Sequence, residues 1–284
     1  MIKELFLNHK GKTFDKWSAY LDVYDKLFTP LQDAPISILE IGVMNGGSLE
    51  VWAKAFPNSK HIVGVDINPD CSGLTFEDNR ISMVVGDAND KDVISRICTT
   101  ITDTFHIIID DGSHIGSDVI RSFNNYFPLL GNDSLYIVED MHSSYWQEFG
   151  GALRTPVTSM SYFKRLADMP NYEHWRLNLT RAEYLKRFGE LYDTEIKDTE
   201  LSTIHSIQFF NSMVIINRKK YEQNLLGNRV ILGDECVVKP DLPLSNGTTI
   251  APLQVTAIDD WQYDPFEMAY RINRLSKEHN EHTL

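Results

Sequence analysis

ILEIGVMNGGSLEVW, residues 38–52, joins an apolar run to a helical pattern through a turn that contains Gly42, Gly46 and Gly47. Glycine allows a tight turn and lets a ligand approach the main chain. The spacing differs from the G-x-G-x-x-G of dinucleotide-binding proteins, because Met44 stands where the second glycine would be. Glu40 lies just before the turn, and its charge disfavours a phosphate but suits a cationic or sulfonium ligand. The turn therefore predicts a small-ligand site that does not hold a pyrophosphate.

Short β-branched runs alternate with helical patterns along the chain. This alternation is typical of a parallel sheet covered by helices on both faces. A final pair of apolar runs, with Asn211 as the turn residue between them, closes the sheet. The sequence therefore predicts an α/β fold: a doubly wound, mostly parallel, seven-stranded Rossmann-like sheet with an N-terminal helix and a C-terminal appendage. The predicted strands are 36–43, 61–67, 81–87, 105–111, 134–140, 204–210 and 212–218, and the predicted helices are 12–28, 119–130, 162–169, 181–191 and those that begin at Ser48 and Asp90.

The expected organisation has three parts: an N-terminal helical segment, 1–35, a main domain, 36–220, and an appendage, 221–284. The appendage mixes glycine, proline and short apolar runs over about residues 221–264, which predicts a loop or small hairpin. Its last part, DPFEMAYRINRL (264–275), has the residues of a helix start and one apolar stripe. We expect this helix to pack on the body or on a subunit partner in a homo-oligomer.

Composition excludes several classes of protein. The chain has 284 residues and a formal net charge of −13, which disfavours a nucleic-acid partner and suits a neutral or cationic substrate. No stretch approaches the roughly 20 apolar residues that span a bilayer, and the first residues lack the apolar run of a signal peptide. Cys71, Cys98 and Cys236 fit neither a disulfide framework nor a zinc site. A cytoplasmic protein with no membrane partner is expected.

Acidic residues end the first three predicted strands. Glu40 ends the first, Asp66 ends the second in GVDI, and Asp87 ends the third in VVGDAND. An acid at the end of the second strand is well placed to accept both hydroxyls of a ribose. Each acid alone could be an ordinary loop residue, but three in succession after a glycine-rich turn predict a nucleoside site.

A second group of acids ends the fourth and fifth strands, in IIIDDGSHIG and YIVEDMHSSYW. Adjacent parallel strands would gather Asp110, Asp111, Glu139 and Asp140, whose mutual repulsion is relieved by a bound cation. Oxygen ligands favour Mg²⁺ or a similar divalent ion over zinc. His114, three residues after Asp111, is the candidate general base, with a structural histidine and catalysis by His142 as the alternatives.

The glycine-rich turn and the acids that follow it resemble the class I S-adenosylmethionine-dependent methyltransferases, whose first motif is E-x-G-x-G-x-G-like. The resemblance implies that residues 36–220 form the S-adenosylmethionine-binding domain. It implies that Gly42, Gly46 and Gly47 hold the methionine portion of the cofactor, together with the intervening Asn45 and the following Ser48. It also implies that Asp66 holds the ribose and that Asp87 and Ala88 contact the adenine. The chain departs from the motif at Val43-Met44-Asn45.

The two later motifs, with residues 204–218, resemble the metal-dependent sugar O-methyltransferases of macrolide biosynthesis and the related rhamnosyl O-methyltransferase and cephalosporin hydroxylase-like group. This resemblance covers residues 12–219. It implies that Asp111, Glu139 and Asp140 are the Mg²⁺ ligands, that His114 is the general base and that Asp110 lies beside the sulfonium. Lys16, Ser18 and Tyr20 match a segment in which the serine and the tyrosine approach the cofactor carboxylate.

We therefore expect a Mg²⁺-dependent O-methyltransferase that acts on a hydroxyl, of a sugar in a glycan or glycosylated metabolite. A catechol methyltransferase would use the same carboxylates, and a non-catalytic partner subunit would keep the fold and cofactor. A nicotinamide-dependent oxidoreductase is disfavoured by the glycine spacing. Tyr145, Trp146, Phe149 and Trp175 are either a wall for sugar stacking or plain core.

Overall fold

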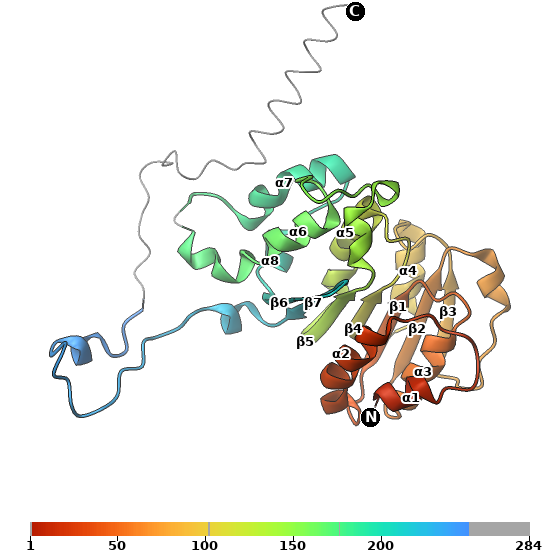
Figure 1. The fold of residues 1–284 in the computed structure, drawn as a ribbon, viewed down its shortest axis with the longest axis horizontal. Coiled ribbons are helices and arrows are strands. Elements are labelled where there is room, and N and C mark those ends of the chain that lie inside the picture. The colour runs from red at the N-terminus through yellow and green to blue at the C-terminus, as the bar shows by residue number, and fades with distance from the viewer. Residues whose placement is uncertain (1, 102, 176, 250–284) are drawn as a thin grey trace, which may run out of the picture. The chain divides into compact units, whose positions relative to one another are not determined.

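The computed structural model describes residues 2–101, 103–175 and 177–249, and its centre is a seven-stranded sheet in the order β3-β2-β1-β4-β5-β7-β6 (Figure 1). Strands β1 to β5 are parallel, and β7 runs antiparallel to both β5 and β6. The predicted mostly parallel α/β sheet is confirmed. The strands are β1 (Ser37–Ile41), β2 (His61–Asp66), β3 (Ile81–Val85), β4 (Phe105–Asp110), β5 (Leu130–Val138), β6 (Ile204–Phe210) and β7 (Met213–Arg218).

The strand register brings the predicted acids to one edge of the sheet. Ile41 pairs with Val65 on one side and with Asp110 on the other, and Asp110 pairs with Val138. The strand order reverses between β1 and β4, which is where ligands bind in doubly wound sheets. Every acid considered above therefore lies in the last two residues of a strand or just after its end at this edge.

Helices cover both faces of the sheet (Figure 1). On one face lie α1 (Ile2–Leu7), α2 (Ser18–Phe28) and α3 (Gly47–Ala55). The other face carries α4 (Lys91–Thr99) and α5 (Gly116–Tyr126), with α6 (Ser159–Leu166) and α7 (Arg181–Tyr192) packed beyond α5, and the short α8 (Asp198–Leu201) contacts α7. No described helix is both long and apolar enough to cross a membrane.

An aromatic cluster packs the three N-terminal helices together. Trp52 of α3 is fully buried and meets Phe6, Tyr24 and Phe28 edge-on, with ring centroids 5.1 to 5.6 Å apart. Buried aromatic pairs of this geometry contribute about 0.5–1.5 kcal/mol each beyond the area they bury. The N-terminal segment is therefore part of the same core as the sheet.

The predicted helix over 12–28 is wrong in its first third, because α2 begins at Ser18. Residues 12–17 form an extended strap instead. The strap crosses the glycine-rich turn, where Thr13 O accepts a hydrogen bond from Gly47 N at 3.3 Å and Lys12 N donates one to Glu50 Oε2 at 3.1 Å. These long-range bonds satisfy backbone groups that a helix would otherwise pair internally.

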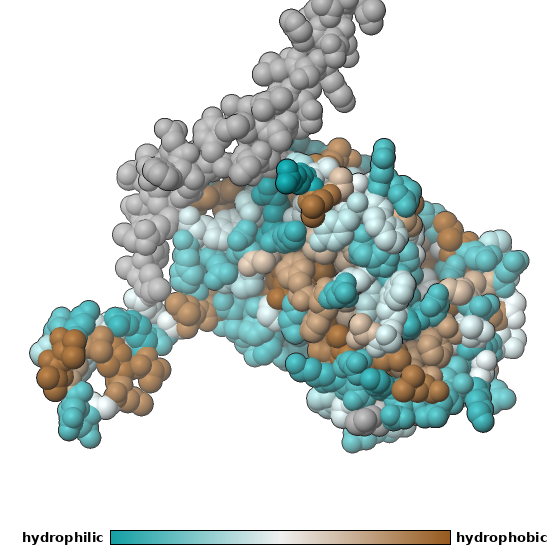
Figure 2. All heavy atoms as spheres, viewed as in Figure 1, coloured by the Kyte–Doolittle hydropathy of each residue, from teal (hydrophilic) through white to brown (hydrophobic). Residues whose placement is uncertain are grey.

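The chain divides into two compact units, Met1–Asn171 with Thr180–Leu225, and Tyr172–Leu179 with Leu226–Leu284. In the second unit, Arg229 N donates to Thr248 O at 2.8 Å and Gly247 N donates to Arg229 O at 2.9 Å, which closes the segment between them into a loop. Figure 2 shows hydrophobic side chains on the surface of this loop, and Val230, Leu232 and Val238 are more than three-quarters exposed. The helix predicted at 264–275 lies outside the described residues.

Candidate active site at the carboxyl ends of the strands

A cavity of 460 Å³ opens where β1, β2, β4 and β5 end. Its volume lies within the roughly 300–1,000 Å³ of small-molecule sites. The lining includes most of the residues predicted for cofactor and catalysis, namely Glu40, Gly42, Ser48, Asp66, Asp87, Ala88, Asp110, Asp111, His114, Glu139 and Asp140. It does not include Ser18, Tyr20, Asn45, Gly46 or Gly47.

The glycines of the turn are needed for close backbone contacts. Gly42 has a φ of +84°, and a Cβ there would lie 2.0 Å from the carbonyl oxygen of Asp111. A Cβ on Gly47 would lie 2.2 Å from the carbonyl oxygen of Lys12 in the strap. Gly42 therefore lets β1 approach the end of β4, whereas Gly47 lets the strap lie directly on the turn.

Asp66 organises the turn as well as lining the cavity. Its Oδ2 accepts hydrogen bonds from Val43 N and Met44 N, both at 2.8 Å, and its Oδ1 accepts one from Asn68 N at 2.9 Å. Met44 adopts a φ of +50°, an uncommon conformation for a residue with a side chain. The two hydrogen bonds from this turn explain how the chain holds that conformation without the usual second glycine.

Two further residues predicted for the cofactor line the cavity beyond β3. Asp87 Oδ1 accepts a hydrogen bond from Asn89 N at 2.8 Å, and Ala88 O accepts one from the hydroxyl of Tyr126 at 2.6 Å. The turn after β3 is thus fixed by its own side chains and by α5. The cavity runs from this turn past Asp66 to the end of β5.

Asp110 is buried at the end of β4 and lines the cavity. Burial raises the pKa of its carboxyl to about 7, against a hydrogen bond from Gly112 N that lowers it. The hydroxyl of Tyr136 also donates to Asp110 Oδ2 at 3.4 Å. Asp110 therefore holds its proton more firmly than an exposed carboxyl does.

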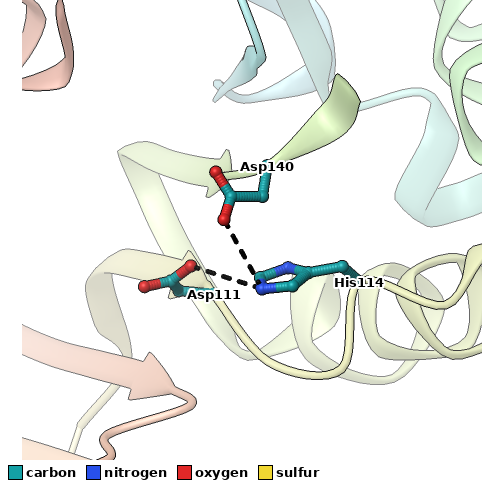
Figure 3. Close-up of side chains that lie close together, drawn as sticks. All are labelled: Asp111, His114 and Asp140. Carbon is teal, nitrogen blue, oxygen red and sulfur yellow. Dashed lines mark ion pairs between the residues drawn. The ribbon is translucent and has the colours of Figure 1, made fainter. Parts of the chain in front are cut away.

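Asp111, His114 and Asp140 converge beside the cavity (Figure 3). His114 Nε2 lies 3.6 Å from Asp140 Oδ2 and 3.9 Å from Asp111 Oδ1, and one potential ligand atom from each residue lies within 4.8 Å of the others. His114 and Asp140 have φ values of +57° and +53°. A left-handed non-glycine residue costs on the order of 1–3 kcal/mol and persists only where the surrounding structure holds it, as active sites often do.

Glu139 lies deeper than these three residues and is not part of their cluster. Its Oε1 accepts hydrogen bonds from Lys16 Nζ, at 2.8 Å, and from the hydroxyl of Tyr24. Burial raises the pKa of Glu139 to about 8, although the charge of Lys16 opposes the change. The predicted metal ligands therefore lie at two depths, with Asp111 and Asp140 beside His114 and Glu139 behind them.

The side chain of Lys16, in the strap, lies among three carboxylates. Its Nζ lies 3.1 Å from Glu40 Oε1, 2.6 Å from Asp111 Oδ2 and 2.8 Å from Glu139 Oε1, and its side chain is 2% exposed. Burial would lower the pKa of Lys16, but the three carboxylates raise it well above its usual value. Sequence reasoning noted Lys16 only as part of a matching segment and missed this role.

Tyr20 supports Asp140 instead of lining the cavity. Its hydroxyl lies 2.7 Å from Asp140 Oδ1 and 3.0 Å from Ser212 O, and it accepts a hydrogen bond from Asp140 N at 3.1 Å. Trp17 Nε1 also donates to Asp140 Oδ1, at 2.9 Å. The structure thus brings Tyr20 to the proposed metal ligand, while Ser18 is exposed at the start of α2.

An exposed aromatic edge, formed by Trp17, His142 and Trp146, lies next to Asp140. The His142 ring is 5.9 Å from Trp17 and 4.7 Å from Trp146, centroid to centroid, and the two tryptophans are 59% and 47% exposed. Trp17 falls within the predicted helix 12–28, yet it precedes α2, lines the cavity and is largely exposed. Trp175, grouped above with Tyr145, Trp146 and Phe149, belongs to the second unit.

Comparisons with known proteins point to one group of enzymes. Residues 21–148 match the family model described as rhamnosyl O-methyltransferase/CmcI. The chain is 32% identical over 215 residues to the 8-demethyl-8-alpha-L-rhamnosyl tetracenomycin-C 2'-O-methyltransferase of Streptomyces olivaceus, covering 72% of this chain and 52% of the relative. It is 37% identical over 155 residues to the mycinamicin VI 2''-O-methyltransferase of Micromonospora griseorubida, covering 51% of this chain and 38% of the relative.

Solved structures agree with the sequence relatives. The MycE methyltransferase from the mycinamycin biosynthetic pathway, in complex with Mg, SAH and mycinamycin VI, superposes with a TM-score of 0.63 at 27% identity. The match covers 78% of this chain and 54% of that chain. The chain thus spans 38% to 54% of the length of these relatives.

Proposed function

We propose that this chain, which resembles the rhamnosyl O-methyltransferase/CmcI group, is a class I S-adenosylmethionine-dependent and Mg²⁺-dependent O-methyltransferase. Its acceptor is a hydroxyl, of a sugar in a glycan or glycosylated metabolite. One observation carries the proposal. A single cavity joins the expected nucleoside side, at Asp66 and Asp87, to the convergence of Asp111, His114 and Asp140.

The cavity fits S-adenosylmethionine in its chemistry. Asp66 and Asp87 offer carboxylate oxygens where ribose hydroxyls and the adenine amino group need acceptors. Glu40 and Asp110 place carboxyl oxygens near the turn, which disfavours a phosphate there, although the charge of Glu40 is paired with Lys16. Gly42 keeps the turn close to Asp111, so the methionine portion would lie directly beside the cluster of Asp111, His114 and Asp140.

Asp111 and Asp140 are the residues we propose to hold the divalent ion, and Glu139, whose Oε1 is paired with Lys16, lies behind them. Their oxygens are hard ligands of the kind Mg²⁺ prefers. Bound there, the ion would lower the pKa of an acceptor hydroxyl. His114 lines the cavity, and its Nε2 lies within 4 Å of both carboxylates, so it is placed to take the hydroxyl proton.

The two exposed indole rings of the aromatic edge, Trp17 and Trp146, suit the acceptor. Exposed indole rings offer flat apolar area with a polar tip, which matches a sugar ring that has apolar faces and hydroxyl edges. The net charge of −13 favours a neutral acceptor over an anionic one.

All three cysteines are free, which supports a reducing compartment such as the cytoplasm.

Two histidines near Asp140 provide a matched test. His114 lines the cavity, whereas His142 Nδ1 contacts Ser212 Oγ and lies 3.9 Å from Asp140 Oδ1 outside the lining. With S-adenosylmethionine, Mg²⁺ and deoxysugar glycosides or catechols, formation of S-adenosylhomocysteine measures turnover. His114→Asn should lower kcat by about 10²–10⁴-fold and leave S-adenosylhomocysteine affinity unchanged, with a much smaller effect for His142→Asn.

Calorimetry on the whole chain tests the proposal without an identified acceptor. The wild type should bind both S-adenosylhomocysteine and Mg²⁺, and Asp111→Asn should lose Mg²⁺ binding. A chain that binds neither ligand is not the enzyme proposed. Turnover with catechols but with none of the glycosides would move the acceptor to planar diols.

A further inference from the structure

Lys16 is the most deeply buried cation found in the cavity wall among the described residues. It contacts one oxygen from each of three carboxylates, at 2.6 to 3.1 Å, and Glu40 and Glu139 are as buried as it is. Nothing in the proposed methyl transfer requires an ammonium at this depth. The arrangement therefore calls for a separate explanation.

The carboxylates around Lys16 are themselves fixed. Trp52 Nε1 donates to Glu40 Oε2 at 3.0 Å, and the hydroxyl of Tyr24 donates to Glu139 Oε1. Both donors are fully buried in the aromatic core. Glu40, Asp111 and Glu139 thus form a built cation position, which we call the inner position, and the ammonium of Lys16 fills it.

Asp111 belongs to the inner position and to the cluster of Figure 3 at once. Its Oδ2 binds Lys16 at 2.6 Å, while its Oδ1 faces His114 Nε2 at 3.9 Å. A carboxylate shared in this way is what bridges the two ions in two-metal sites, where the ions lie roughly 3.5–4 Å apart. Together with Asp140, the three carboxylates of the inner position would attract two divalent ions if the inner position were open.

We propose that Lys16 is a positioning residue that occupies the inner position as a permanent monovalent cation and so restricts the site to one divalent ion, bound between Asp111 and Asp140. The inference rests on the proposed function, because it assumes that outer ion. Lys16 holds Asp111 and Glu139 by one oxygen each and leaves Asp111 Oδ1 directed at the reaction side. A single ion gives the acceptor oxygen one place to bind.

The test counts ions bound to the whole chain, with Mn²⁺ as the probe because it takes the same oxygen ligands as Mg²⁺. Calorimetry should give one Mn²⁺ for the wild type and two for Lys16→Ala, and the second ion should produce the magnetic coupling of a close Mn²⁺ pair in electron paramagnetic resonance. Lys16→Met fills the inner position without charge and should bind one. Lys12→Ala is the control, because Lys12 is in the same strap but pairs with Glu50, at 2.9 Å, outside the cavity lining.

Each outcome decides the inference. One ion in Lys16→Ala, or two in Lys16→Met, would overturn it while leaving the proposed function intact. A wild type that binds no Mn²⁺ would overturn both. If Lys16→Ala does not fold without metal, excess Mn²⁺ should restore its circular dichroism, because the ion takes the place of the ammonium; a chain that stays unfolded with Mn²⁺ also contradicts the proposal.

Discussion

Replacing Tyr20 by phenylalanine removes a single hydroxyl from behind the proposed metal ligand Asp140. That hydroxyl has one hydrogen for two acceptors, Asp140 Oδ1 at 2.7 Å and Ser212 O at 3.0 Å, and it also accepts from Asp140 N at 3.1 Å. The change leaves the amide of Asp140 without this partner in a residue already held at a φ of +53°. Loss of a hydrogen bond to a charged group, with an unpaired donor left behind, should cost about 1–3 kcal/mol of unfolding free energy.

The effect on metal binding should exceed the effect on the fold. Removing a residue that holds a metal ligand lowers metal affinity about 10–100-fold. Trp17 still donates to Asp140 Oδ1, at 2.9 Å, so we expect Tyr20→Phe to stay within that range and not to abolish binding. Affinity for S-adenosylhomocysteine should not change, because Tyr20 does not line the cavity.

Tyr162→Phe is the matched control for this prediction. Tyr162 is fully buried in α6, and its hydroxyl donates to the neutral Asn124 Oδ1 at 3.1 Å, away from the cavity lining. Urea unfolding should show that both variants are destabilised, whereas Mn²⁺ calorimetry should show weakened binding only for Tyr20→Phe. If both variants bind Mn²⁺ like the wild type, Tyr20 does not hold a metal ligand and our account of its hydroxyl fails.

Three further predictions address the strap, the sheet and the metal. Gly47→Ala should cost about 1–3 kcal/mol of unfolding free energy, because its Cβ would lie 2.2 Å from Lys12 O, and it should weaken S-adenosylhomocysteine binding by displacing the adjacent Ser48, which lines the cavity; Gly73→Ala, with no atom within 4 Å of its Cβ, should do neither. Burial lowers the pKa of His106 from 6.5, and its Nδ1 accepts from Ser37 N at 3.1 Å. The unfolded chain therefore protonates first as pH falls through 6.5, so urea unfolding should show stability lost below that pH in the wild type and a flatter profile in His106→Gln. EDTA should abolish turnover and added Mg²⁺ should restore it; full turnover in EDTA would remove the metal from the mechanism.

The sheet and its site edge could be predicted because both depend on local patterns. Apolar runs bounded by acids mark buried parallel strands, and parallel strands in register bring their carboxyl ends together whatever the rest of the chain does. Asp66, Asp110, Asp111 and Asp140 therefore line one cavity, as the strand ends predicted.

The strap could not be predicted in the same way. Trp17, Tyr20 and Tyr24 have helical spacing, and periodicity alone extends the helix back through Trp17. In the structure Trp17 precedes α2, and its indole donates a hydrogen bond to Asp140 instead of packing as part of a helix face. A side chain that serves a site can thus share the spacing of side chains that serve a core, and the sequence does not distinguish the two.

Lys16 shows why counting acids is not enough to count metals. Its three partners lie 24, 95 and 123 residues away, so no window of sequence contains the contact. Crowded carboxylates at the strand ends indicate that positive charge is needed nearby, because like charges repel one another. Positive charge can come from a metal ion or from a side chain, however, and a lysine ammonium can occupy the position where a second ion would bind. The number of divalent ions therefore follows from which carboxylate oxygens the ammonium leaves free, and Asp111, which gives one oxygen to Lys16 and turns the other toward His114, is the residue at which that division is made.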